Sequence, residues 1–333
     1  MDRPTPPPNV TVLSGGLGGA RLAMAALECG IAATTTFITN VADDWCVGGL
    51  PVCPDTDAVM YALSNRFDAQ RGWGVKGDTF PTPRPEEPSW FGIGQHDRAT
   101  HELRRALLDA GATLATATAA LATAAHIQAR LIPVTCDPVR TSIRTATGWH
   151  AFQEWLVRDR GPAVQDIRWD GLEAARPTGG VIEALTDADV VVIASSSPMA
   201  SLAPILGVGG VRQALEQRCG PTLALSPVVL GRPATTDRDR HRDKARRQLL
   251  AAAGIDHTPS GIAEWLSPLA SHFVIDPTDA EWAAAVAATG AAPVLAPVIG
   301  IDAAERRALA VVVRSMVGWQ RRSRTSASTS SVS

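Results

Sequence analysis

The chain has 333 residues, a formal net charge of −2 at pH 7, 45% hydrophobic residues and 19% charged residues. This composition is typical of a folded globular protein and gives no reason to expect nucleic acid as a partner. The five cysteines include no CxxC pair, which favours a reduced, cytoplasmic protein. No apolar stretch is long enough for a transmembrane helix, so no membrane partner is expected.

Short β-branched runs alternate with alanine-rich helical stretches along most of the chain. Residues 10–13 are predicted as a buried strand, followed by a glycine turn and a helix over residues 20–29. Strand–helix alternation of this kind predicts an α/β fold, with a Rossmann-like parallel sheet and helices on both faces. The further strands are predicted at residues 34–39, 189–194, 221–225, 272–275 and 293–295.

The middle of the chain has a different composition, rich in Trp, Gly and Pro at first and then in alanine. We predict that it forms a smaller α+β insertion over the ligand edge of the sheet, with short strands near residues 131–135 and 142–144. The predicted organisation is a disordered leader at 1–8, a nucleotide-binding core at 9–66 and 164–320, the insertion at 67–163 and a disordered tail at 321–333.

A glycine-rich turn separates the first predicted strand from the first predicted helix. Glycines allow close approach of backbone N–H groups to an anion, and a helix N-terminus favours negative charge. The turn therefore predicts phosphate binding, with a charge-assisted bond from Arg21. It lacks the Gly-Lys-Ser/Thr end of a Walker loop and the acid of a dinucleotide site, since Asn40 stands there. A tight turn without a ligand is the alternative. The predicted phosphate-binding residues are Gly15, Gly16, Gly18, Gly19, Ala20 and Arg21.

Four aspartates follow the second predicted strand within fifteen residues. They are expected at the same sheet edge as the glycine turn. Carboxylates crowded in an apolar setting need a cation, and Mg²⁺ prefers carboxylate and phosphate oxygens. We therefore predict Mg²⁺-assisted phosphoryl-group transfer. The alternatives are a helix cap for Asp55, a turn for Asp43 and a structural role for Asp57. The four are Asp43, Asp44, Asp55 and Asp57.

Serines follow two later strands and give the same edge a second polar pocket, for a base or a phosphate. These are Ser195, Ser196, Ser197, Ser201 and Ser226. A basic run at residues 238–247 is interpreted as a solvated helix face. Trp90 and Phe91 belong to an aromatic-rich stretch that suits either a stacked planar ring or a small insertion core.

Six motifs in this order resemble the 2-phospho-L-lactate transferase family of coenzyme F420 biosynthesis. The resemblance spans about residues 9–318. It implies transfer of a phosphorylated three-carbon acid from a guanosine-diphosphate-linked donor to the deazaflavin Fo, with release of GMP, by a homodimer. The motifs read VLSGGLGGAR from Val12, NVADD from Asn40, CPDTD from Cys53, RGWG from Arg71, ATH from Ala99 and FQEW from Phe152.

The resemblance also implies roles for individual residues. Asp43 would hold Mg²⁺ against the diphosphate, and Asp55 or Asp44 would help as ligand or base. The glycine turn and the serines would bind the donor. The acceptor would lie near Asn40, Trp90, Phe91 and Asp97.

The chain departs from the family pattern at Gln95, at Ser197 and over residues 231–237. A divergent transferase acting on another alcohol therefore stays an alternative. A nucleotide-sugar-binding regulatory protein of related fold is a second alternative. The Trp-rich middle distinguishes them, because a deazaflavin site would use it and a UDP-sugar sensor would not.

Overall fold

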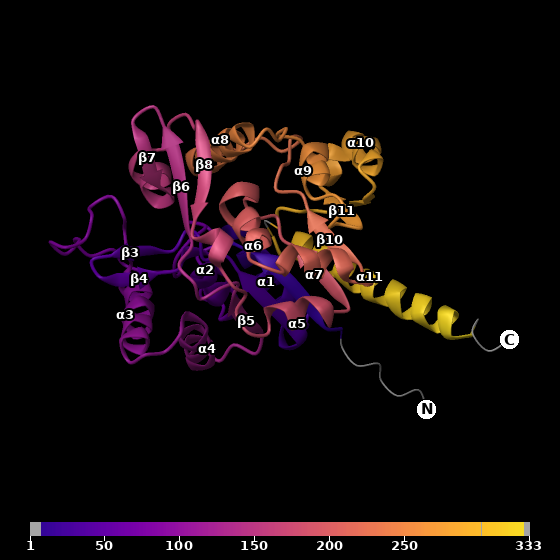
Figure 1. The fold of residues 1–333 in the computed structure, drawn as a ribbon, viewed down its shortest axis with the longest axis horizontal. Coiled ribbons are helices and arrows are strands. Elements are labelled where there is room, and N and C mark those ends of the chain that lie inside the picture. The colour runs from indigo at the N-terminus through magenta and orange to yellow at the C-terminus, as the bar shows by residue number, and fades with distance from the viewer. Residues whose placement is uncertain (1–7, 301, 330–333) are drawn as a thin grey trace.

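The computed structural model describes residues 8–300 and 302–329, so most of the predicted leader lies outside the described residues. A seven-stranded, wholly parallel sheet forms the centre of the molecule (Figure 1). This confirms the predicted Rossmann-like α/β fold. Its strands are, in spatial order, β12 (Ala292–Leu295), β11 (His272–Ile275), β10 (Thr222–Leu225), β9 (Val190–Ile193), β1 (Val10–Ser14), β2 (Thr35–Thr39) and β5 (Arg130–Pro133).

Helices cover both faces of the sheet, because its inner strands are apolar on both sides. In β9, Val190 and Val192 join the hydrophobic cluster on one face, while Val191 and Ile193 join the cluster on the other. The first face carries α1 (Gly16–Glu28), α2 (Pro54–Leu63) and α11 (Ala303–Thr329). The second carries α5 (Val181–Thr186), α6 (Ala203–Gly207), α7 (Val211–Gln217), α8 (Asp237–Ala252), α9 (Pro259–Trp265) and α10 (Ala283–Ala288).

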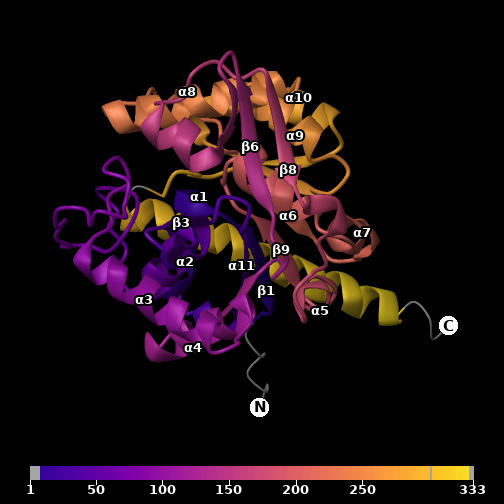
Figure 2. The same ribbon diagram turned by 60° about the vertical axis from the view of Figure 1, so that its left-hand side comes forward.

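Two small antiparallel units stand outside the central sheet. One is the hairpin β3 (Trp45–Val47)–β4 (Leu50–Val52), directly after the aspartates. The other has β6 between its neighbours, and Figure 2 shows β6 and β8 rising away from the central strands. Helices α3 (Gln95–Asp109) and α4 (Leu114–Ala124) lie between α2 and β5 in the chain. The second unit comprises β6 (Arg140–Thr145), β7 (Gly148–Ala151) and β8 (Asp166–Asp170).

The insertion predicted at 67–163 is not wholly separate from the core. Strand β5 lies in that range, yet it pairs in parallel with β2, Phe37 opposite Leu131. The apolar run of β5 is short, and its partner strand β2 is distant in the sequence. Composition alone therefore did not predict that β5 belongs to the central sheet. The division into core and insertion otherwise stays a prediction.

The predicted tail is also only partly as expected. Helix α11 continues to Thr329 and projects from the body of the molecule (Figure 1), although disorder was expected from residue 321. Arginine and alanine in this stretch favour helix. Residues 330–333 lie outside the described residues. No helix in the described part of the chain is long and apolar enough to cross a bilayer.

The strand order reverses beside β1. The chain passes from β1 to β2 and β5 on one side, and then returns to β9 on the other. In open α/β sheets, ligands bind outside the carboxyl ends of the strands at such a switch point. The turn after β1 and the serines after β9 are therefore at the position where the fold makes a crevice.

Candidate active site

The loops after β1 and β9 are joined directly. The backbone N–H of Gly15 donates to Ser196 Oγ (2.9 Å), and that hydroxyl donates to the Gly15 carbonyl (2.8 Å). Both residues are buried. Strands β1 and β9 are adjacent, so their carboxyl ends meet, as the sequence predicted. These two hydrogen bonds hold the glycine turn at the switch point.

Asn40 connects two of the predicted catalytic aspartates. It follows β2, and its Nδ2 donates to Asp43 Oδ1 (3.2 Å), to Asp55 Oδ2 (3.0 Å) and to the Ala200 carbonyl (3.1 Å). Its own Oδ1 accepts from the N–H of Ala42 (2.9 Å). The structure therefore brings Asp43 and Asp55 together from two different segments. Sequence analysis placed Asn40 with the acceptor and missed this bridging role, for which only its position at a strand end was a signal.

Asp55 lies at the N-terminus of α1, although it belongs to the first turn of α2. Its Oδ2 also accepts from Ser201 Oγ (2.8 Å), and its carboxylate accepts a hydrogen bond from the Gly16 N–H. Asp55 makes no side-chain cap for α2, so the simple capping alternative does not describe it. Its buried carboxylate is directed towards Gly15, Asn40 and Ser201.

The aspartates beside the crevice are buried and repel one another. Burial raises the pKa of Asp43 well above its ordinary range, and nearby Asp55 and Asp44 raise it further. Burial raises the pKa of Asp55 to about 6 and that of Asp44 to about 8, against hydrogen bonds that lower both. A divalent cation would reverse this repulsion, because it favours the ionised carboxylates.

The glycine turn is packed more tightly than a simple phosphate loop requires. A Cβ on Gly18 would meet the Ser195 backbone, and one on Gly19 would meet the side chains of Ser14 and Val59. Gly18, Gly19 and Ala20 are buried, whereas Gly16 and Leu17 are half-buried. These later glycines thus let α1 approach its neighbours, and Gly16 and Leu17 are the more accessible residues of the turn.

The predicted serines divide into two groups. Ser196 and Ser201 bond to Gly15 and Asp55, as described above. Ser197 caps the helical turn η4 (Pro198–Leu202) by accepting from Ala200, and Ser195 Oγ donates to Val298 O (3.4 Å). Ser226 is fully buried and donates its hydroxyl to Val228 (2.7 Å), so that hydroxyl is engaged within its own turn.

Asp57 belongs to a separate buried network. It pairs with Arg104, whose Nη1 lies 3.1 Å from Asp57 Oδ2, and it accepts from the Cys53 N–H (3.1 Å). His101 Nδ1 lies 3.6 Å from the same carboxylate. This favours the structural alternative for Asp57. Sequence analysis missed Arg104, although its i,i+3 spacing from His101 on a helix was a usable signal.

Asp97 lies at the far end of this network. Its carboxylate accepts from Tyr61 Oη (2.6 Å) and lies 3.2 Å from His101 Nε2. Burial raises the pKa of Asp97, but the hydrogen bonds and the charge of His101 outweigh burial and lower it. The carboxylate of Asp97 is thus engaged by Tyr61 and His101 inside the protein.

The aromatic residues predicted for the acceptor gather beside the β3–β4 hairpin. The Trp90 ring lies 6.1 Å from that of Trp45 and 5.8 Å from that of Phe91, by centroids. Trp45 directly follows Asp44 in the chain. Its indole nitrogen is buried without a hydrogen-bond partner among the described residues. The cluster is therefore adjacent in the chain to the aspartates.

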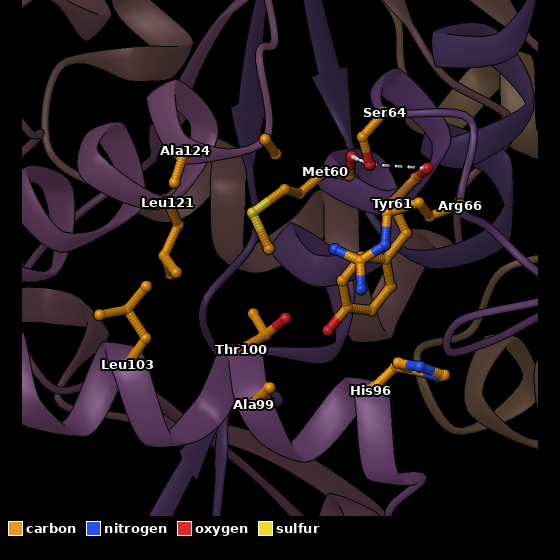
Figure 3. A pocket seen from close by; sticks show the side chains of 11 residues that line it. Met60, Tyr61, Ser64, Arg66, His96, Ala99, Thr100, Leu103, Leu121 and Ala124 are labelled. Carbon is orange, nitrogen blue, oxygen red and sulfur yellow. Dashed lines mark hydrogen bonds between the residues drawn. The ribbon is translucent and has the colours of Figure 1, made fainter. Parts of the chain in front are cut away.

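A pocket of about 190 Å³ lies elsewhere, between α2, α3 and α4. Figure 3 shows Met60, Leu103 and Leu121 turned towards one another across it, with Tyr61 and His96 at its side. None of the predicted site residues lines it.

Within the described ranges, no three His, Cys, Asp or Glu side chains form a metal-ligand group. A Mg²⁺ ion at Asp43 and Asp55 would thus be bound by these two carboxylates together with substrate oxygens.

A sequence model of the family "2-phospho-L-lactate transferase CofD" matches residues 10–315. The chain belongs to this family. It is therefore an enzyme, a transferase. Proteins named phosphoenolpyruvate transferase are similar to it: that of Streptomyces griseus is 35% identical over 292 residues, covering 84% of this chain and 89% of its own. That of Mycolicibacterium smegmatis is 32% identical over 288 residues, covering 80% and 86%.

Solved structures support the fold. A crystal structure of protein BH3568 from Bacillus halodurans aligns with a TM-score of 0.57 at 15% identity, covering 87% of this chain and 92% of that one. A second structure of that protein, described as a member of the UPF0052 family, gives a TM-score of 0.55 at 16% identity. At these identities the similarity concerns architecture alone.

Proposed function

We propose that this transferase moves a phosphoenolpyruvyl group from a guanosine-diphosphate-linked donor to a hydroxyl of the deazaflavin Fo, in coenzyme F420 biosynthesis. The observation that carries the proposal is the Asn40 bridge, which holds Asp43 and Asp55 at the switch point beside the N-terminus of α1. The names of its relatives favour phosphoenolpyruvyl over phospholactyl as the transferred group.

Asp43 and Asp55 are the residues that would hold Mg²⁺. They offer hard carboxylate oxygens from two segments, and their mutual repulsion in a buried setting needs a cation. Bound Mg²⁺ would neutralise charge on the donor's diphosphate. Asn40 fixes both carboxylates, and Ser201 adds a second restraint on Asp55.

The donor's phosphates would lie against the half-buried first residues of α1, Gly16 and Leu17. Gly16 and Leu17 are in the first turn of α1, whose N–H groups have no carbonyl partner within the helix. The hydroxyl oxygen of the acceptor attacks the phosphorus that carries the three-carbon acid. The bond from that phosphorus to the GMP oxygen breaks, and GMP leaves with the electron pair.

Asp44 would accept the hydroxyl's proton. Its Oδ1 is buried without a hydrogen-bond partner among the described residues, so it can take a proton without losing another bond. Positioning and electrostatics would supply most of the acceleration, as in other phosphoryl transfers.

The aromatic cluster beside Asp44 suits a planar ring. Trp45 has an indole N–H without a partner among the residues that the structure describes, and the half-buried Trp90 and Phe91 offer ring faces and edges. We place the deazaflavin there, with its hydroxyl-bearing chain directed towards the aspartates.

Titration of the protein with Fo, in the presence of Mg²⁺ and GDP, tests the acceptor directly through deazaflavin fluorescence. We expect saturable binding that Trp90→Ala weakens and that Trp149→Ala, a partly exposed indole on β7, leaves unchanged. Binding of UDP-N-acetylglucosamine in place of Fo would contradict the proposal and favour a nucleotide-sugar sensor.

A further inference from the structure

Trp90 and Phe91 lie on a loop that is closed at its base. Residues 79–94 form neither helix nor strand and lead directly into α3. At the base, the Gln95 N–H donates to the Thr79 carbonyl (2.9 Å), and Thr79 Oγ1 donates to Gln95 Oε1 (3.2 Å). A loop whose two ends meet in this way is an Ω-loop, a kind of loop that often carries a function.

Asp78 fixes the base of this loop to the N-terminus of α3. Its Oδ1 accepts from the His96 N–H (2.8 Å) and its Oδ2 from the Asp97 N–H (3.0 Å), two donors that the helix itself leaves free. The Asp78 side chain is only 1% exposed. Because the base is fixed, the contacts of the rest of the loop determine where its aromatic residues lie.

A buried ion pair holds the body of the loop to α3. Arg98 Nη2 donates to Glu87 Oε2 (2.9 Å) and Arg98 Nη1 donates to Glu87 Oε1, so the pair is bidentate. The two side chains are only 10% and 3% exposed. Glu87 Oε2 also accepts from the Arg84 N–H (3.1 Å), which joins the pair to the loop backbone. Removing one partner would leave a buried charge uncompensated, and this is costly.

A second ion pair between the loop and α3 is exposed and provides a comparison. Arg84 Nη2 donates to Glu102 Oε1 (3.2 Å), and these side chains are 51% and 48% exposed. Exposed pairs contribute little to stability, because water screens the charges. The Arg98–Glu87 pair is therefore the one expected to hold the loop in place.

The loop packs against the β3–β4 hairpin. A Cβ on Gly48, in the turn of the hairpin, would lie 2.7 Å from Glu87 Cγ. Phe91 packs in one small hydrophobic cluster with apolar residues of both hairpin strands. The ring of Trp90 lies 6.1 Å from that of Trp45, by centroids. Glu87 is thus close to the hairpin and only three residues before Trp90.

The hairpin is anchored to α3 independently of the loop. Arg104 Nη1 donates to the Pro51 carbonyl (3.0 Å), and Arg105 Nη1 donates to the Gly49 carbonyl. Loss of the Arg98–Glu87 pair should therefore free the loop while the hairpin, and the aspartates that precede it, stay in place.

We propose that Arg98 and Glu87 are positioning residues for the acceptor. Their ion pair holds the loop of residues 79–94 on the hairpin and so fixes Trp90 and Phe91 where they would contact the deazaflavin. That the ring bound there is the deazaflavin rests on the proposed function. The hold on the loop does not, because it follows from the contacts of the loop alone.

Hydrogen–deuterium exchange tests the hold on the loop without any ligand. The N–H groups of Glu87 and Phe91 donate to carbonyls within the loop and so report its opening. We expect Arg98→Gln to speed exchange in residues 79–94 by about tenfold or more, because a charge-assisted pair is lost. Arg84→Gln, the matched control, should exchange like the wild type. Arg98→Lys keeps the charge without the bidentate geometry and should lie between them.

Steady-state kinetics tests the positioning of the acceptor. Arg98→Gln and Glu87→Gln should raise KM for Fo about tenfold and change kcat and the KM of the donor by less than about twofold. A purely structural role would instead reduce the amount of active enzyme and leave KM unchanged. Thermal unfolding of each variant shows whether it is folded, and Arg98→Lys should partly restore KM.

Wild-type exchange in Arg98→Gln, or an unchanged KM for Fo, overturns the proposal. The outcomes also separate it from the proposed function. Faster exchange in Arg98→Gln, without transfer to Fo by the wild type, would leave the hold on the loop and remove both the proposed function and the acceptor. Transfer to Fo with equal KM in the wild type and Arg98→Gln would support the function and remove the positioning role.

Discussion

The carboxylate of Asp55 fills the space that a side chain on Gly15 would need. A Cβ built on Gly15 would overlap Asp55 Oδ2 and lie 2.5 Å from Ser201 Oγ. Gly15 has an extended backbone, so close packing and not an unusual φ requires glycine here. Gly15 and Asp55, forty residues apart in the sequence, thus belong to one packed unit.

Gly15→Ala should therefore displace Asp55 and lower turnover. A shift of about 1 Å in a positioning group can cost about 100-fold in rate, and we expect an effect of that order. The turnover of Gly15→Ala should be measured by steady-state kinetics and compared with that of Gly179→Ala. The latter is the control, because a Cβ on Gly179 would meet nothing within 4 Å. Equal rates in the two variants would show that the contact is unimportant for catalysis.

Asp43→Asn should lower turnover on the order of 100-fold and raise the Mg²⁺ concentration needed for activity. The amide keeps the shape and the bond to Asn40 but removes a charge that a cation requires. Mg²⁺ titrations of kcat should be compared with those of Asp166→Asn, an exposed aspartate on β8. Near-normal rates with unchanged Mg²⁺ dependence would refute the role of Asp43.

Arg104→Met should destabilise the fold by about 3–5 kcal/mol, because it leaves Asp57 buried without its partner. The double variant Arg104→Met, Asp57→Asn should lose less, since the uncompensated charge is gone. Urea unfolding of the single and double variants provides the measurement. A double variant less stable than Arg104→Met would argue that Asp57 has other essential contacts.

The Asp97 network should add stability that disappears in acid. Because the pKa of Asp97 is lowered in the folded protein, the ionised form stabilises the fold above the unfolded pKa, about 3.9, and this is lost as pH falls. Asp97→Asn should thus be less stable than the wild type at pH 7, with the difference shrinking towards pH 3. A difference independent of pH would contradict this.

Much of the fold was predictable because local patterns and global packing agree. The strands β1, β2, β9 and β11 are short runs rich in β-branched and apolar residues, and a parallel sheet buried on both faces favours such runs. The strand near residues 131–135 was predicted within the insertion, but as β5 it pairs with β2 of the central sheet, a contact between segments more than ninety residues apart. The end of α11 shows helix propensity where composition had indicated disorder.

The site was predictable where it follows strand ends, and less so where it depends on side-chain packing. Parallel strands deliver Gly15, Asn40 and Ser196 to one edge, which periodicity alone can indicate. The Asn40 bridge and the buried face of α8 require three-dimensional neighbours. The basic residues around Arg242 have the same sequence pattern whether their side chains face water or pack against the protein.

The most direct test of the account is the reaction itself. Purified protein should be incubated with Fo, Mg²⁺ and either guanylylated phosphoenolpyruvate or guanylylated phospholactate, and the products followed by mass spectrometry. We predict GMP and an acidic phosphoenolpyruvyl derivative of Fo, formed by the wild type and nearly absent with Asp43→Asn. No acidic deazaflavin product with either donor, from folded protein, would contradict the proposed function.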